Sequence, residues 1–164
     1  MTTQSTNAIL NTIRSRLLTF APLGGGPTLA TQIGSTASGS GSDGKLFKHQ
    51  APDDLTGTWG VLRLRDFPQQ GFDGGMMLRG QVELILYGKP RTPTLVTNLE
   101  RMADTVTEAW MDWAYTASGH ISAHDITSRF HIPYEEPANR ELVAIRLLLP
   151  FRCAPTFLTQ YASA

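Results

Sequence analysis

The segment from Met76 to Trp113 constrains the fold of this chain more than any other part of the sequence. Apolar residues alternate from Met76 to Tyr87, which predicts a strand with one buried face and one largely polar face. Arg79, Gln81 and Glu83 fall on the polar face. Such a strand is typical of an antiparallel sheet that is covered on one side.

A helix is predicted directly after this strand. Pro90 ends the strand because it has no N–H to donate, and Thr92 followed by Pro93 is a typical helix start. Apolar residues then recur at steps of three and four up to Trp113, with the helix stop expected at Ser118-Gly119. The apolar arc of this helix needs a sheet to cover, and the preceding strand supplies one.

The rest of the chain adds a first helix and further strands. A stripe from Ile9 to Phe20 predicts the helix, with Ser5 or Thr6 as its cap and Arg14 and Arg16 flanking the stripe. Strands are expected at Thr58–Phe67 and Leu142–Phe151, the second apolar on both faces as in a central strand, with Pro68–Gly75 as a loop and a short strand within Ser122–Ile132.

We treat residues 22–57 as a long loop region rich in Gly and Ser, with a short strand near Thr28–Ile33 and a connector at Lys45–Asp54. Residues 155–164 form a C-terminal tail. The prediction is one α+β domain over residues 1–164: a single mostly antiparallel sheet, two helices packed on one face, and a long Gly/Ser-rich loop insertion.

Composition argues against several classes of function. With 14 basic and 14 acidic residues the chain lacks the basic surplus of a non-specific DNA-binding protein, although a local patch stays open. The single cysteine, Cys153, excludes an internal disulfide and is expected to be a small buried hydrophobe. No cationic segment precedes an apolar run and no apolar stretch reaches about 20 residues, so we expect neither a signal peptide nor a membrane span.

Two motifs resemble ligand sites without meeting their requirements. Gly39 to Lys45 matches the spacing of a phosphate-binding loop, but Leu46 stands where Ser or Thr should reach magnesium. His120, His124, Asp125 and His131 are spaced more loosely than zinc ligands usually are, and solvated loop histidines are the default interpretation. We therefore expect no catalytic residue, no cofactor and no metal.

Four carboxylates repeat every fourth residue on the polar arc of the long helix: Glu100, Asp104, Glu108 and Asp112. Neighbouring pairs repel by a few tenths of a kcal/mol, with Arg101 close enough in sequence to offset them. One interpretation is a solvated face. The alternative is that the stripe meets arginines of an adjacent subunit, for which the candidates are Arg63, Arg65, Arg79 and Arg91.

The order of these elements resembles the tail terminator proteins of long-tailed bacteriophages, the family that includes the phage lambda terminator. The resemblance rests on the helix at Asn7–Thr19, the strands at Trp59–Arg65 and Met76–Tyr87, the helix at Pro93–Trp113 and the strand at Leu142–Phe151. The Gly34–Gly44 segment is longer than the family pattern leads us to expect.

The resemblance implies a structural subunit of the virion, assembled in the host cytoplasm, that forms a homohexameric ring. Such a ring caps the tail tube, stops its polymerisation and joins tail to head. Its implied partners are further copies of itself, the tail tube protein, the head-side connector and, in a contractile tail, the sheath, while DNA passes through the channel as cargo. Alternatives are a head completion protein or head–tail adaptor, and a small ligand- or metal-binding domain.

Overall fold

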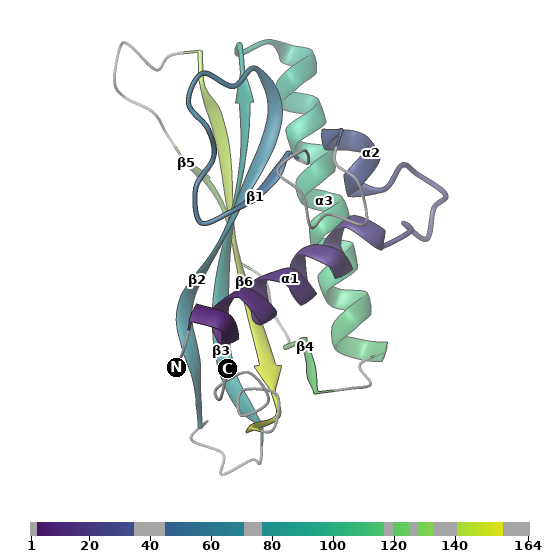
Figure 1. Ribbon diagram of the computed structural model, residues 1–164. Helices are drawn as coiled ribbons and strands as arrows, with labels where there is room; N and C mark the ends of the chain where they lie inside the picture. Colours follow the sequence, from purple (N-terminus) through teal and green to yellow (C-terminus); the bar gives the residue numbers. More distant parts are fainter. Residues whose placement is uncertain are drawn as a thin grey trace.

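A computed structural model describes residues 3–34, 45–70, 77–116, 120–124, 128–132 and 141–155. These residues form three helices and six strands in an α+β arrangement (Figure 1). The helices are α1 (Thr3–Thr19), α2 (Leu29–Ile33) and α3 (Pro93–Thr116), and the strands are β1 (Leu46–Lys48), β2 (Gly57–Gln70), β3 (Leu78–Lys89), β4 (Ile121–Ala123), β5 (Ser128–Ile132) and β6 (Val143–Cys153).

The strands make one mostly antiparallel sheet in the order β1-β2-β3-β6-β4, with β5 also paired to β6. The β2–β3, β3–β6, β4–β6 and β5–β6 pairs are antiparallel, and β1 joins β2 in parallel. Strand β6 therefore has neighbours on both sides, which confirms its predicted central place. The predicted fold class is confirmed as well, with α2 as a third helix.

The helices cover one face of this sheet. Side chains of α1, α2 and α3 share a single buried cluster with one alternating set from the strands, which includes Leu62, Val82, Leu84, Leu86 and Leu147. Figure 1 shows α1 crossing the strands and α3 running alongside them, with α2 next to α3. The other face of the sheet carries no helix among the described residues, and we call it the helix-free face.

Strand β3 and helix α3 follow the prediction closely. The Leu95 amide donates to Thr92 Oγ1 at 3.2 Å, so Thr92 caps α3 and Pro93 is its first residue. Trp110, which is fully buried, donates its indole N–H to the Pro150 carbonyl of β6 at 2.9 Å. This bond ties α3 to the central strand.

The predicted long loop region contains two regular elements, so its description as a loop is wrong at both places. The expected strand near Thr28–Ile33 is helix α2, because the Thr28 hydroxyl accepts from the Thr31 amide and Gly34 closes the helix at a φ of 67°. The expected connector contains β1. Buried Arg14 donates from Nε to the Leu46 carbonyl at 2.6 Å and so fastens β1 to α1, although we had expected this arginine to flank the buried stripe.

Other boundaries differ by a few residues. Helix α1 begins at Thr3, ahead of the expected caps Ser5 and Thr6. Strand β2 runs to Gln70, into the expected loop, with bulges that interrupt its register after Leu64 and after Asp66. Two short strands, β4 and β5, stand where one was predicted. The expected stop of α3 at Ser118-Gly119, the Gly39–Gly44 part of the glycine-rich motif and the tail from residue 156 lie outside the described residues.

Candidate interaction surface

Arginines gather on the helix-free face of the sheet. Strand alternation and register place five of them there, on three adjacent strands, and we call this set the arginine face: Arg63, Arg65, Arg79, Arg146 and Arg152. The described strand positions of the same face carry two carboxylates, Glu83 and Asp66, the latter opposite Gln81. A chain without net charge thus concentrates positive charge on one side.

Glu83 lies at the centre of the arginine face between arginines of both neighbouring strands. Arg146 of β6 donates from Nε to Glu83 Oε2 at 2.6 Å, and Arg65 Nη1 of β2 lies 3.8 Å from the same oxygen. The Glu83 side chain is 17% exposed, against 29% for Arg146 and 44% for Arg65. A partly desolvated carboxylate between two guanidinium groups holds both in place.

The outer arginines reach beyond this central group. Arg63, directly opposite Glu83 in the sheet, donates from Nε to the His49 carbonyl at 2.7 Å. Arg79 of β3 stands directly opposite Arg152 of β6. Arg152 donates from Nε to Ser122 Oγ of β4 at 3.0 Å, which fastens its side chain to the neighbouring strand.

The other end of the helix-free face is aromatic. Trp59 of β2 pairs with Tyr87 of β3, and their rings stack with centroids 5.5 Å apart and planes 17° from parallel. Trp59 is 8% exposed and also lines a hollow with Pro52, Leu55 and neighbouring residues. The segment between β1 and β2 therefore covers this end, and the arginine end lies beyond it.

The structure places the predicted interface arginines in two locations. Arg63, Arg65 and Arg79 share the arginine face, whereas Arg91 is exposed on the connection between β3 and α3. Sequence reasoning missed Arg146 and Arg152. Their signal was the period of two along the last strand, but their position beside β3 depends on a register that periodicity does not give.

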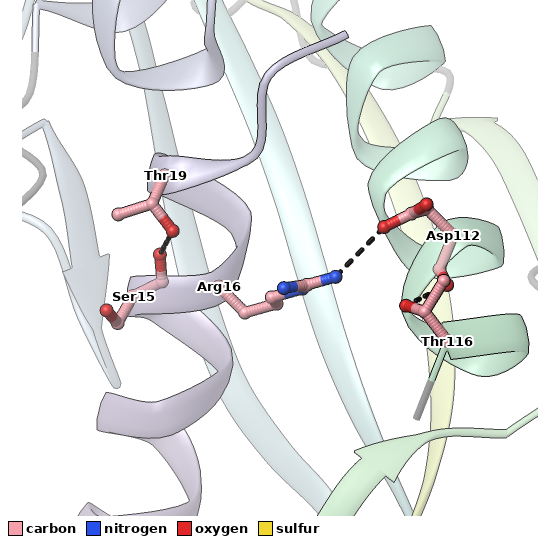
Figure 2. Close-up of polar contacts among 5 residues, drawn as sticks. All are labelled: Ser15, Arg16, Thr19, Asp112 and Thr116. Atoms are coloured by element: carbon pink, nitrogen blue, oxygen red, sulfur yellow. Dashed lines mark hydrogen bonds and ion pairs between the residues drawn. The ribbon is translucent and has the colours of Figure 1, made fainter. Parts of the chain in front are cut away.

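Two carboxylates of the acidic stripe bind segments that lie far from α3 in the sequence. Arg16 of α1 donates to Asp112 Oδ2 at 2.9 Å (Figure 2). Its guanidinium carbon lies 5.9 Å from the centre of the Trp113 ring. Glu108 accepts from the Leu23 amide at 2.8 Å. These two carboxylates fasten α1 and the segment after it to α3.

The other half of the stripe lies farther towards the start of α3. Asp104 is exposed and Glu100 is half-buried. Arg101 and Asp104 line a hollow whose walls also include Pro22, Gln32 and Thr105. Gln32 of α2 donates to Thr105 Oγ1 at 2.8 Å, which closes one side of this hollow against α3.

The structure describes some of the other residues that the sequence analysis considered, namely Cys153 and part of the histidine cluster. Cys153 is fully buried, as predicted, and burial raises the pKa of its thiol to about 11. His120 is exposed and His124 half-buried, while Asp125 and the side chain of His131 lie outside the described residues. Within the described part of the chain, no three acidic, histidine or cysteine side chains are grouped closely enough to hold a metal ion.

Two comparisons, with protein families and with curated proteins, give no relative of this chain. No family model matches the chain, and a search of curated proteins finds no match either. Among the helices that the structure describes, none combines the length and hydrophobicity needed to span a membrane.

Proposed function

We propose that this protein is a structural component of a bacteriophage neck, a tail terminator. In this proposal its copies form a homohexameric ring that caps the tail tube, stops tube polymerisation and joins the tail to the head. The ring contacts the tail tube protein on one side and the head-side connector on the other, and DNA passes through it. The protein acts by contact and carries out no covalent chemistry.

The observation that carries the proposal is a sheet with helices on one face and an arginine-rich opposite face. The two long helices and the strands follow one another in the order that resembles the terminator family. A two-layer domain of this kind buries its core without using the arginine face, whose side chains are exposed or half-buried among the described residues. Guanidinium groups on a rigid sheet suit recognition of carboxylates, because their planar N–H donors match the two oxygens of a carboxylate.

Electron microscopy of tails assembled with and without this protein tests the proposal. We expect its absence to give overlong tails or tails that are not joined to heads. Tails of normal length that fail only to join heads would instead indicate an adaptor. Virions of normal length and normal infectivity without the protein would refute a role in the neck.

Light scattering on the purified chain provides a second test. A ring subunit is expected to give a stable species of about six times the 18.0 kDa monomer mass, or to bind the ends of purified tail tubes. A monomer that does not bind tube ends but binds zinc or nucleotide would contradict the proposal and favour a small ligand-binding domain.

A further inference from the structure

We infer that the arginine face binds the phosphate backbone of double-stranded DNA without reading its sequence. Four arginines carry this inference: Arg63, Arg65, Arg146 and Arg152. We leave out Arg79, which already interacts within the chain. In the proposed function DNA is only cargo, and the inference rests on that role while adding the surface of each copy that meets the cargo.

The four arginines leave a surplus of positive charge on this side of the molecule. The described strand positions of the same face carry two carboxylates, Glu83 and Asp66, so the arginines exceed the carboxylates there by two. The chain as a whole, with 14 basic and 14 acidic residues, lacks the surplus of a non-specific DNA-binding protein. A local basic patch is nevertheless sufficient to attract a polyanion.

Three of these arginines are held by bonds that use only the inner nitrogen of the side chain. Arg63 donates from Nε to a backbone carbonyl at 2.7 Å, Arg146 from Nε to a carboxylate of β3 at 2.6 Å, and Arg152 from Nε to a hydroxyl of β4 at 3.0 Å. None of these bonds uses the terminal Nη groups, which carry four of the five N–H donors of a guanidinium. Because Nε is fixed, less side-chain entropy is lost when the Nη groups donate to a phosphate.

The arginines of β2 are the most accessible members of the set. Arg63 is exposed and the Arg65 side chain is 44% exposed, whereas Arg146 and Arg152 are half-buried. Arg65 lies at a bulge of β2, and its Nη1 atom is 3.8 Å from Glu83 Oε2, which is farther than a hydrogen bond. We therefore expect Arg63 and Arg65 to make the closest phosphate contacts, with the two β6 arginines adding further positive charge.

The spread of the arginines favours a polymeric anion over a single acidic side chain. Arg146 and Arg152 lie about 20 Å apart along β6 at roughly 3.3 Å per residue. Strands β2 and β6 lie about 10 Å apart across β3, at roughly 4.8 Å between neighbouring strands. One carboxylate cannot reach guanidinium groups over such distances. A DNA duplex carries one charge about every 1.7 Å along its axis, so one ligand can supply phosphates over the whole span.

The opposite end of the helix-free face favours neither stacked bases nor any anion. Trp59 is 8% exposed and stacks on Tyr87, so this pair is a poor platform for the bases of a single strand. The hollow beside Trp59 is lined by acidic residues, among them Asp53, Asp54 and Glu141. Their negative charge confines the DNA to the arginine end. The contacts expected there are phosphate contacts, which hold a duplex without reading its sequence.

Fluorescence anisotropy of a fluorescein-labelled duplex of about 20 base pairs tests the inference on the purified chain. We expect a dissociation constant between about 1 and 100 µM that does not depend on the sequence of the duplex. With two to four phosphate contacts, the logarithm of the association constant should fall with the logarithm of the salt concentration at a slope of about −2 to −4. This slope corresponds to a loss of roughly 10- to 100-fold between about 50 and 200 mM salt.

Arg63→Gln and Arg65→Gln each remove one expected phosphate contact. Each should make the salt slope less steep by about 1, and the double variant should bind at least about tenfold more weakly at about 50 mM salt. Arg63→Lys keeps the charge and should keep the slope. Arg91→Gln is the control, because Arg91 is exposed but lies on the connection between β3 and α3, off the arginine face. Circular dichroism and thermal unfolding establish that each variant is folded.

Two results would overturn the inference: no duplex binding at about 50 mM salt, or a salt slope that the double variant leaves unchanged. Binding of a poly-glutamate peptide as tightly as the duplex, with the same loss in the double variant, would assign the arginine face to an acidic protein instead.

Duplex binding and the neck role are measured separately, so either can fail alone. A chain that forms the ring and controls tail length but binds no duplex would keep the proposed function and lose the inference. Duplex binding through these arginines, by a chain whose absence leaves virions normal, would refute the neck role and leave the DNA contact in place.

Discussion

Replacing Gly88 with alanine tests how closely α3 approaches the sheet. Gly88 lies on the covered face of β3, and a Cβ atom there would be 2.2 Å from Leu95 Cδ2 and 2.9 Å from Leu99 Cδ1. Normal carbon contacts begin near roughly 3.5 Å, so the Leu95 methyl group would have to move by about 1.3 Å. Both leucines belong to the buried cluster, which limits that movement.

The size of the effect follows from two opposing contributions. Overpacking a dense core costs typically about 1–3 kcal/mol. Alanine also restricts the unfolded chain and packs better in a strand than glycine, and these effects stabilise the folded state by about 0.5–1 kcal/mol. We therefore expect Gly88→Ala to lower the free energy of unfolding by about 1–2 kcal/mol, or the Tm by roughly 2–8 °C for a domain of this size.

Urea unfolding followed by tryptophan fluorescence and circular dichroism measures this loss, at one fixed protein concentration because assembly would shift the apparent stability. Gly24→Ala is the matched control, since nothing lies within 4 Å of a Cβ atom at that position. Leu95→Ala removes the obstructing methyl group. In that background Gly88→Ala should cost clearly less, because Leu99 Cδ1 at 2.9 Å is then the main obstruction to the new Cβ atom, and we expect a coupling of about 1 kcal/mol. An equal loss in both backgrounds would refute the packing argument.

Three further predictions concern single contacts. A double-mutant cycle with Arg16→Met and Asp112→Asn should give a coupling below about 1 kcal/mol that shrinks with added salt, because both side chains are about one third exposed; a larger, salt-independent value would contradict this. Trp110→Phe should lower the free energy of unfolding by about 1–3 kcal/mol through the lost bond to the Pro150 carbonyl and the lost volume, as measured by urea unfolding; an unchanged midpoint would show that the bond contributes nothing. Burial raises the pKa of the Cys153 thiol from an ordinary 9.0 to about 11, so between these pH values the folded state keeps a proton that the unfolded state releases. The resulting contribution to stability is complete below pH 9 and is lost as pH rises towards about 11. The unmodified chain should therefore lose more stability than Cys153→Ala over this interval, and parallel urea midpoints would refute the assignment.

The sequence by itself predicted the α+β class, strand β3, helix α3 and the cap at Thr92. These features are local: a period of two or of 3.6 and the chemistry of a helix start depend on residues a few positions apart. For the same reason, the sequence could place Leu62 and Val82 on the buried faces of their own strands. Each strand could be assigned a buried face without knowledge of its neighbours.

Only the tertiary structure decided which side chains meet. Arg16 and Asp112 are 96 positions apart, and Arg146 reaches Glu83 because β6 pairs with β3 in one particular register. Strand β1 exists because a parallel partner and the buried Arg14 hold it, and neither is visible in three residues of sequence. Register and helix placement are set by the packing of distant segments, so the arginine face formed only when three strands came together.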